Sequence, residues 1–339
     1  MTVRILPILF LLTAVPALAV AQEKPAPPRS FDPPFDSSTR RMTMPDPTKL
    51  PTSGPVPDEP YIKVPVDLAF GAYQRGLYVT AMQEAMNRLK TNSDDAPAMA
   101  LIGELYRDGL SVKQSQEEAN KWYRLAADRG DAAAQFSLGL AYLEGRGVKA
   151  DPKEARALFE KAAEKNQPSA LYNLAVMEIQ GDIQDFRKAA DLFRRSMDAG
   201  NVEATYALAM LYKDGSGVPQ DRAMATQLMR KAADGKLVPA MVDYAIARFN
   251  GTGTEKNEEE AAKYFIRAAS LNNPIAQNRL ARLYVVGRGV KADLVEAMKW
   301  HVLARANGLP DEWLEEKLRT LSQGQKTAVE EAIQRFLGK

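Results

Sequence analysis

Small and apolar residues recur with a 36-residue period between residues 95 and 308. The copies begin at residues 95, 131, 167, 201, 237 and 273, and the third is two residues shorter than the others. In each copy, alanine at position four is followed one helical turn later by a large apolar residue. This spacing, with proline near the start of four copies, is typical of a helix with one buried face. We therefore expect a first helix, helix A, whose packed alanines are Ala98, Ala134, Ala170, Ala204, Ala240 and Ala276.

Glycine at position fifteen of every copy predicts the end of helix A, because a left-handed C′ residue with a side chain loses roughly 1–2 kcal/mol. Position 21 is a good N-cap residue in every copy, so a second helix, helix B, should begin there. Glutamate three residues later predicts a capping box in four copies. The expected N-caps are Ser115, Asp151, Asp185, Asp221, Asn257 and Asp293, and the glutamates are Glu118, Glu154, Glu260 and Glu296.

Neither helix can bury its apolar stripe alone, so the copies must stack. The sequence thus predicts an all-α fold built from antiparallel helix pairs. Copy three lacks the longer glycine loop and reads Gly181 to Gln184, while copy five has Thr254 where valine is usual. We expect these two joints to bend differently from the others.

The segments Ala134–Tyr142, Gly145–Val148, Asp151–Ala155 and Ala162–Ala163 resemble the Sel1-like repeat, a relative of the tetratricopeptide repeat. The resemblance recurs in six copies, at residues 95–130, 131–166, 167–200, 201–236, 237–272 and 273–308. It implies a right-handed α-solenoid. Proteins of this kind typically act as adaptors, and periplasmic ones often regulate envelope signalling or surface polysaccharide production.

The two ends of the chain differ from the array. Residues 1–21 carry Arg4, an apolar run and small residues up to Ala21, which is typical of a secretory signal peptide cleaved after Ala21. The alternative is an uncleaved membrane anchor, but prolines interrupt this short segment. Residues 22–65 contain 12 prolines among 44 residues and should form an extended, disordered linker. We expect a bacterial periplasmic or secreted protein without stable membrane insertion after cleavage.

The regions beside the array resemble caps. Residues 66–94 carry a degenerate version of the helix pair, and residues 309–339 should form two further helices. One begins near Asp311, and the other begins at Ser322, where Gln325 completes a capping box.

Composition narrows the functional classes. The chain has 45 Lys plus Arg against 43 Asp plus Glu, so no strong field would attract nucleic acid, and we expect no nucleic-acid partner. It has no cysteine, and therefore no disulfide, thiolate metal site or thiol nucleophile. Stability must come from packing.

Few residues offer catalytic chemistry. The single histidine, His301, falls in a column that holds aromatic residues or methionine in the other copies, which favours a packing role over that of a general base. The acidic run Glu258–Glu260 lies in the first turn of a helix, where the helix dipole favours negative charge. We predict no catalytic, cofactor or metal site, and the protein should not be an enzyme.

Position twelve of helix A is the candidate partner-binding column. It contains tyrosine in four copies and opposite charges in the other two: Tyr106, Tyr142, Glu178, Tyr212, Arg248 and Tyr284. Tyrosine is prominent at binding surfaces. The alternative is that each ring packs against the loop of its own repeat, with polar contacts supplied nearby by residues such as Gln135, Asp243, Asn278 and Arg282.

These observations favour a protein–protein interaction scaffold whose concave face binds a peptide or a partner domain. One alternative is a protein that binds glycan or peptidoglycan through the exposed tyrosines. Another is a hydrolase that acts on β-lactams, as described for some secreted Sel1-like proteins. That branch is rich in cysteine, which this chain lacks, and the Ser-x-x-Lys signature is absent after the signal region.

Overall fold

The computed structural model describes residues 67–181 and 183–338, and within them the protein is all-α, as predicted. The predicted signal peptide (1–21) and proline-rich linker (22–65) lie outside the described residues. The helices are α1 (Leu68–Gln74), α2 (Tyr78–Thr91), α3 (Ala96–Asp108), α4 (Gln116–Asp128), α5 (Ala132–Glu144), α6 (Pro152–Glu164), α7 (Pro168–Gln180), α8 (Phe186–Asp198), α9 (Val202–Asp214), α10 (Arg222–Asp234), α11 (Val238–Asn250), α12 (Glu258–Ser270), α13 (Pro274–Val286), α14 (Leu294–Ala306), α15 (Glu312–Leu318) and α16 (Gln323–Phe336).

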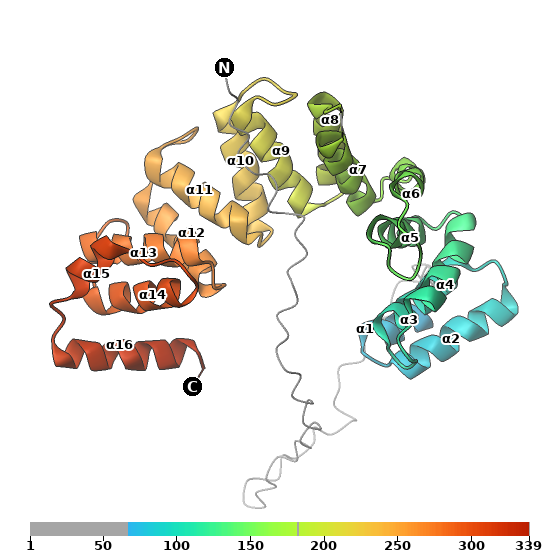
Figure 1. The fold of residues 1–339 in the computed structure, drawn as a ribbon, viewed down its shortest axis with the longest axis horizontal. Coiled ribbons are helices and arrows are strands. Elements are labelled where there is room, and N and C mark those ends of the chain that lie inside the picture. The colour runs from blue at the N-terminus through green and yellow to red at the C-terminus, as the bar shows by residue number, and fades with distance from the viewer. Residues whose placement is uncertain (1–66, 182, 339) are drawn as a thin grey trace, which may run out of the picture. The chain divides into compact units, whose positions relative to one another are not determined.

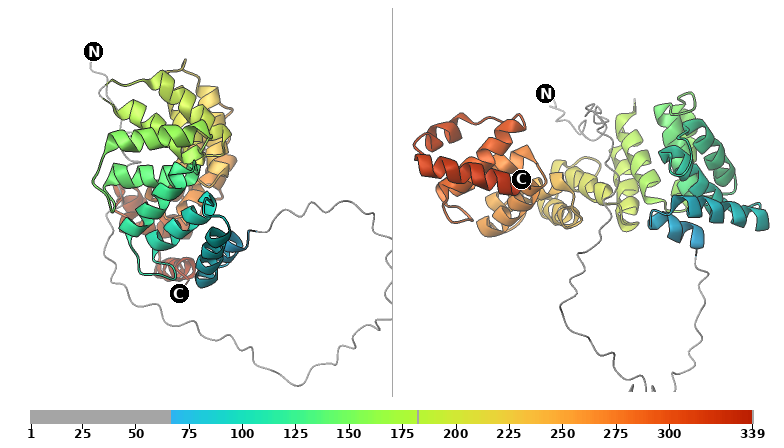
Figure 2. Two further views of the ribbon diagram at one scale, coloured as in Figure 1. Left: turned by 90° about the vertical axis from the view of Figure 1, so that its right-hand side faces the viewer. Right: turned by 90° about the horizontal axis from the view of Figure 1, so that it is seen from below.

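The helices pair in chain order (Figure 1). Each odd-numbered helix from α3 to α13 is a helix A and packs on the helix B that follows it. Each helix B then packs on helix A of the next copy, which also holds for α2 against α3. The further views show the same succession of pairs (Figure 2).

Alanine allows these close helix contacts. The six alanines at position four of helix A are 0% exposed, and those at position 25, in helix B, are at most 2% exposed. The backbones of neighbouring helices can therefore approach closely, while large side chains such as Phe159 and Phe193 fill the remaining space. Buried residues from helix B of copy two to the C-terminal cap form one continuous hydrophobic cluster.

The predicted N-caps of helix B are confirmed. Each of the six side chains accepts a hydrogen bond from a backbone N–H in the first turn of its helix. The capping boxes predicted at Glu118, Glu154, Glu260 and Glu296 are wrong in their second half. The N-cap N–H is donated instead to the carbonyl of position twelve in helix A, as from Ser115 to Tyr106 at 3.0 Å. The glutamates consequently pair elsewhere, as Glu118 does with Lys121.

The loop glycines separate copy three from the rest. Five of the six glycines at position fifteen take left-handed conformations, with φ between 68° and 73°. Gly181 in copy three is extended, at φ −66° and ψ 166°, so the loop of copy three differs from the others. In copy five, Gly251 and Gly253 have φ of 73° and 68°, like their counterparts. The different bending of these two joints stays a prediction.

Additional helices lie at both ends of the array. The pair α1–α2 packs on α3, and α15 and α16 pack on the last copy. At the C-terminal end, the predicted helix start near Asp311 is confirmed, with Asp311 as the N-cap, and Ser322 forms the expected capping box with Gln325. No helix between residues 67 and 338 combines the length and apolar character needed to cross a membrane.

Candidate partner-binding site

The column predicted as a partner-binding stripe lies at the junctions between helices. The backbone carbonyl of each position-twelve residue accepts a hydrogen bond from the N-cap N–H of helix B, at 2.8–3.0 Å. Five of the side chains are half-buried and Glu178 is buried. The column therefore fastens the loop between helices A and B in every copy: Tyr106, Tyr142, Glu178, Tyr212, Arg248 and Tyr284.

Side chains of this column also contact neighbouring helices. The hydroxyl of Tyr142 accepts a hydrogen bond from Arg124 of α4, in the preceding copy. Glu178 pairs with Arg156 of the preceding copy and with Lys188 of its own copy. Tyr212 repeats the arrangement of Tyr142, with Arg194 of α8 at 3.4 Å from its hydroxyl.

Arg248 makes its polar contacts within its own copy. Arg248 donates to Thr254 Oγ1 at 2.9 Å and to the Glu255 carbonyl at 2.7 Å, and it pairs with Glu260. Burial raises the pKa of Tyr284, whose ring packs against the main core. Most side chains of the column are thus engaged in contacts within the protein. Its role in partner binding stays a prediction.

A pocket of about 350 Å³ lies on another side of helix A, between the last two copies and the C-terminal cap. Helices α11 and α13 supply most of its wall, and Trp313 of α15 also lines it. Its apolar wall includes Ile246, Phe249 and Val286, and Arg279, Arg282 and Arg288 also line it. Such a volume is at the lower end of the range for ligand pockets.

Arg288 is held between a ring and a carboxylate. The centre of its guanidinium lies 4.4 Å from the Phe249 ring centroid. Its Nε and Nη2 atoms both donate to the carboxylate of Glu258. Hydrogen bonds from Arg288 and Lys256 lower the pKa of Glu258 to about 2, so the carboxylate keeps its charge at neutral pH.

Arg282 is held in the same way. Its guanidinium lies 5.0 Å from the Trp313 ring centroid. Nε and Nη2 donate to the two oxygens of Asp311 at 2.7 and 2.8 Å. In both arginines the remaining Nη1 group has no hydrogen-bond partner among the described residues, and both side chains are more than 40% exposed.

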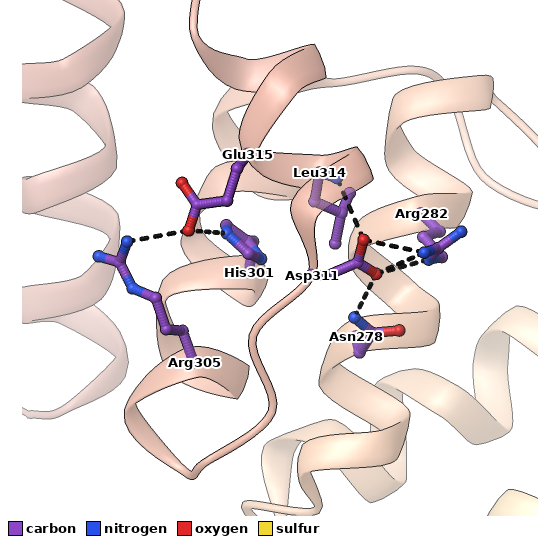
Figure 3. Close-up of polar contacts among 7 residues, drawn as sticks. All are labelled: Asn278, Arg282, His301, Arg305, Asp311, Leu314 and Glu315. Carbon is purple, nitrogen blue, oxygen red and sulfur yellow. Dashed lines mark hydrogen bonds and ion pairs between the residues drawn. The ribbon is translucent and has the colours of Figure 1, made fainter.

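Asp311 fixes the cap helix to the array (Figure 3). Its carboxylate accepts from Arg282, from Asn278 Nδ2 at 2.7 Å, and from the Leu314 N–H at the start of α15. Although desolvation acts to raise it, these hydrogen bonds keep the pKa of Asp311 below its ordinary value. The same carboxylate therefore positions Trp313 and Arg282 together in the pocket.

His301 forms the second attachment of α15 (Figure 3). Its side chain is 0% exposed, as a packing position requires, and its Nε2 lies 2.9 Å from Glu315 Oε1. Arg305 donates to the same oxygen at 3.0 Å. The hydrogen bond from His301, followed by that from Arg305, lowers the pKa of Glu315. The packing interpretation thus captures the burial of His301 but omits its contact with the cap.

The predicted column and the pocket occupy different sides of helix A. At about 100° per residue, position twelve points away from positions seven, ten and fourteen, which contribute Arg279, Arg282 and Val286. The sequence pattern indicates Arg282 only as a polar neighbour of the position-twelve column. Comparing position ten across the copies singles out this residue, because position ten is apolar in copies two to five and arginine in copy six.

Comparisons with known proteins agree with this architecture. A family model described as Sel1 repeat matches residues 96–131, 132–167, 168–201, 202–237, 238–273 and 274–309. The solved Sel1 repeat protein from Oxalobacter formigenes is similar at 28% identity and a TM-score of 0.60, covering 70% of this chain and 96% of that chain. The comparison with curated proteins gives no match.

A second solved structure is c5321, a protective antigen present in uropathogenic Escherichia coli strains, which displays an SLR fold. It is 26% identical with a TM-score of 0.50, covering 80% of this chain and 68% of that chain. Stacked antiparallel helix pairs that repeat one sequence pattern define a helical repeat protein. The chain belongs to the Sel1 repeat family. Repeats of this family generally mediate protein–protein interactions and are generally not catalytic.

Proposed function

We propose that this protein is a protein-binding scaffold that holds a segment of a partner in the pocket formed by α11, α13 and α15. The observation that carries the proposal is the juxtaposition of an open apolar wall with two arginines held against rings. Interface centres are enriched in aromatic residues and arginine, and preorganised side chains lose little entropy on binding.

The proposed location is the periplasm or the outside of a bacterial cell, where the scaffold would regulate envelope signalling or surface polysaccharide production. The pattern of residues 1–21 and the family resemblance support it. Cleavage after Ala21 would leave Gln22 as the mature N-terminus. Mass spectrometry of the N-terminal peptide from fractionated cells tests this location, and an intact Met1 in the cytoplasmic fraction would contradict it.

In-cell crosslinking followed by affinity capture tests the scaffold. The decisive variant is Val286→Trp, because Val286 is 51% exposed in the pocket wall and a larger side chain there would fill the pocket. Leu271→Trp is its control, since Leu271 is 54% exposed and lies outside the pocket. We expect the unaltered chain and the control to capture the same envelope protein and Val286→Trp to lose it.

The predicted column is tested in the same experiment. The triple variant Tyr142→Ala, Tyr212→Ala and Arg248→Ala removes side chains from three copies, and circular dichroism establishes whether the chain still folds. Loss of the partner by a folded triple variant would place the contact on the column. If no chain captures a protein, the scaffold proposal is wrong, and binding to a glycan array becomes the next test.

A further inference from the structure

We infer that the segment bound in this pocket is acidic, with an aspartate or glutamate beside an apolar side chain. The inference rests on the proposed function and adds the chemistry of the partner. It follows from charge complementarity, because three arginines line one pocket.

The two ring-stacked arginines are prepared for a second carboxylate. Arg282 and Arg288 each use Nε and Nη2 on a carboxylate of this chain, and each keeps Nη1 for another acceptor. The rings and carboxylates hold the guanidinium planes in place before a ligand arrives. Charge-assisted hydrogen bonds from such fixed donors are stronger than those between neutral groups.

Arg279 leaves the pocket with an excess of positive charge. It is exposed, and within residues 67–181 and 183–338 no carboxylate lies within ion-pair distance of it. Asp311 and Glu258 balance the other two arginines, so one cationic group lacks a counter-charge. The first five copies have no arginine at either position seven or position ten, which makes Arg279 and Arg282 particular to copy six.

The apolar part of the wall favours a segment in which an apolar side chain stands next to the acidic residue. Ile246 and Val286 line the pocket together with Phe249 and Trp313. A peptide that alternates carboxylate and apolar side chains would match both kinds of surface. A nucleic-acid backbone fits less well, because a continuous row of phosphates would place charge against the apolar part of the wall, and because Asp311 and Glu258 already neutralise two of the three arginines.

Selection from a random-peptide display library on the full chain tests the inference. The test variant is Arg279→Gln with Arg288→Gln, which leaves Arg282 and the attachment of α15 in place. Arg267→Gln is the matched control, because Arg267 also stacks on a ring, that of Tyr264, pairs with a carboxylate and is 43% exposed, against 45% for Arg288. Thermal unfolding by circular dichroism establishes that all three chains fold.

We expect the unaltered chain and Arg267→Gln to select peptides rich in Asp and Glu beside apolar residues. In fluorescence anisotropy, replacing the acids of a selected peptide by Asn and Gln, or using the double variant, should weaken binding at least tenfold. Selected peptides without acidic enrichment, no selectable peptide, or equal binding by the double variant would overturn the inference. An acid-independent peptide that Val286→Trp still blocks would leave the scaffold standing and remove only the acidic partner.

Discussion

At the scale of single residues, His301 combines core packing with a polar attachment. Its column contains Phe159, Phe193 and Phe265 in other copies, and all four side chains are at most 2% exposed. Only in copy six does a cap helix bring a carboxylate, Glu315, to the same place. The column thus shows that the ring must be buried, whereas the hydrogen bond depends on an element outside the repeats.

Replacing His301 by phenylalanine should lower the free energy of unfolding by less than about 1 kcal/mol. The ring still fills its slot, and the loss is one hydrogen bond to a partly exposed carboxylate. His301→Ala should lower it by about 3 kcal/mol, because it leaves a cavity. Urea titration followed by circular dichroism measures both changes. Equal losses in the two variants would show that the hydrogen bond, rather than packing, is what matters.

We expect the attachment of α15 to the array to weaken in acid, because it depends on the charge of Asp311. Its pKa is below the ordinary value of 3.8 in the folded protein, so the ionised form is favoured there. This contribution to stability is complete above about pH 4 and is lost as the pH falls through the folded pKa. Trp313 fluorescence should change in that acid range. The change should be absent in Asp311→Asn, which keeps a helix N-cap but loses the charge.

At the scale of elements, the second glycine of each long loop sets how closely two copies approach. A side chain at Gly253 would overlap the backbone carbonyl of Arg222, at the start of α10 in the preceding copy. The same holds for Gly289 against Glu258. These loops therefore act as spacers between copies, in addition to ending helix A.

Gly253→Ala should lower the free energy of unfolding more than Gly308→Ala. Both residues have positive φ, 68° and 83°, so both variants lose roughly 1 kcal/mol to backbone strain. A Cβ added at Gly308 would enter open space, whereas a Cβ added at Gly253 would overlap the backbone of Arg222. We expect a further loss of about 2 kcal/mol for Gly253→Ala. Thermal unfolding compares the pair, and similar midpoints would contradict the spacer role.

The periodicity of the sequence predicts most of the helices and their bounds. Position-specific residues such as Asp151 and Gly145 specify where helices begin and end, because caps and left-handed turns are local features. The capping boxes were overestimated because the competing acceptor, such as the Tyr142 carbonyl for Asp151, comes from the preceding helix. The pocket was missed for a related reason. Asp311 meets Arg282 across 29 residues, and nothing local indicates that contact.

At the scale of the whole array, contacts run from each copy to the next. Removing residues 309–339 should expose the end of copy six, because this segment covers it. Leu314 of the segment is 0% exposed, and Phe336 packs edge-on against Trp300 of copy six, with the ring centroids 5.2 Å apart. Hydrogen exchange should quicken in α13 and α14 and stay unchanged in α5 to α8, because stability in stacked repeats is largely a neighbour property. Uniform quickening along the chain would instead indicate one cooperative unit.

The position of the pocket also bears on how such a chain changes by gene duplication. Its walls come from copies five and six and from α15, so they need none of the first four copies. Gain or loss of a whole internal copy upstream would change the number of repeats before the pocket while leaving the residues that line it intact. The length of the array and the lining of the pocket can therefore be inherited and altered separately in this protein.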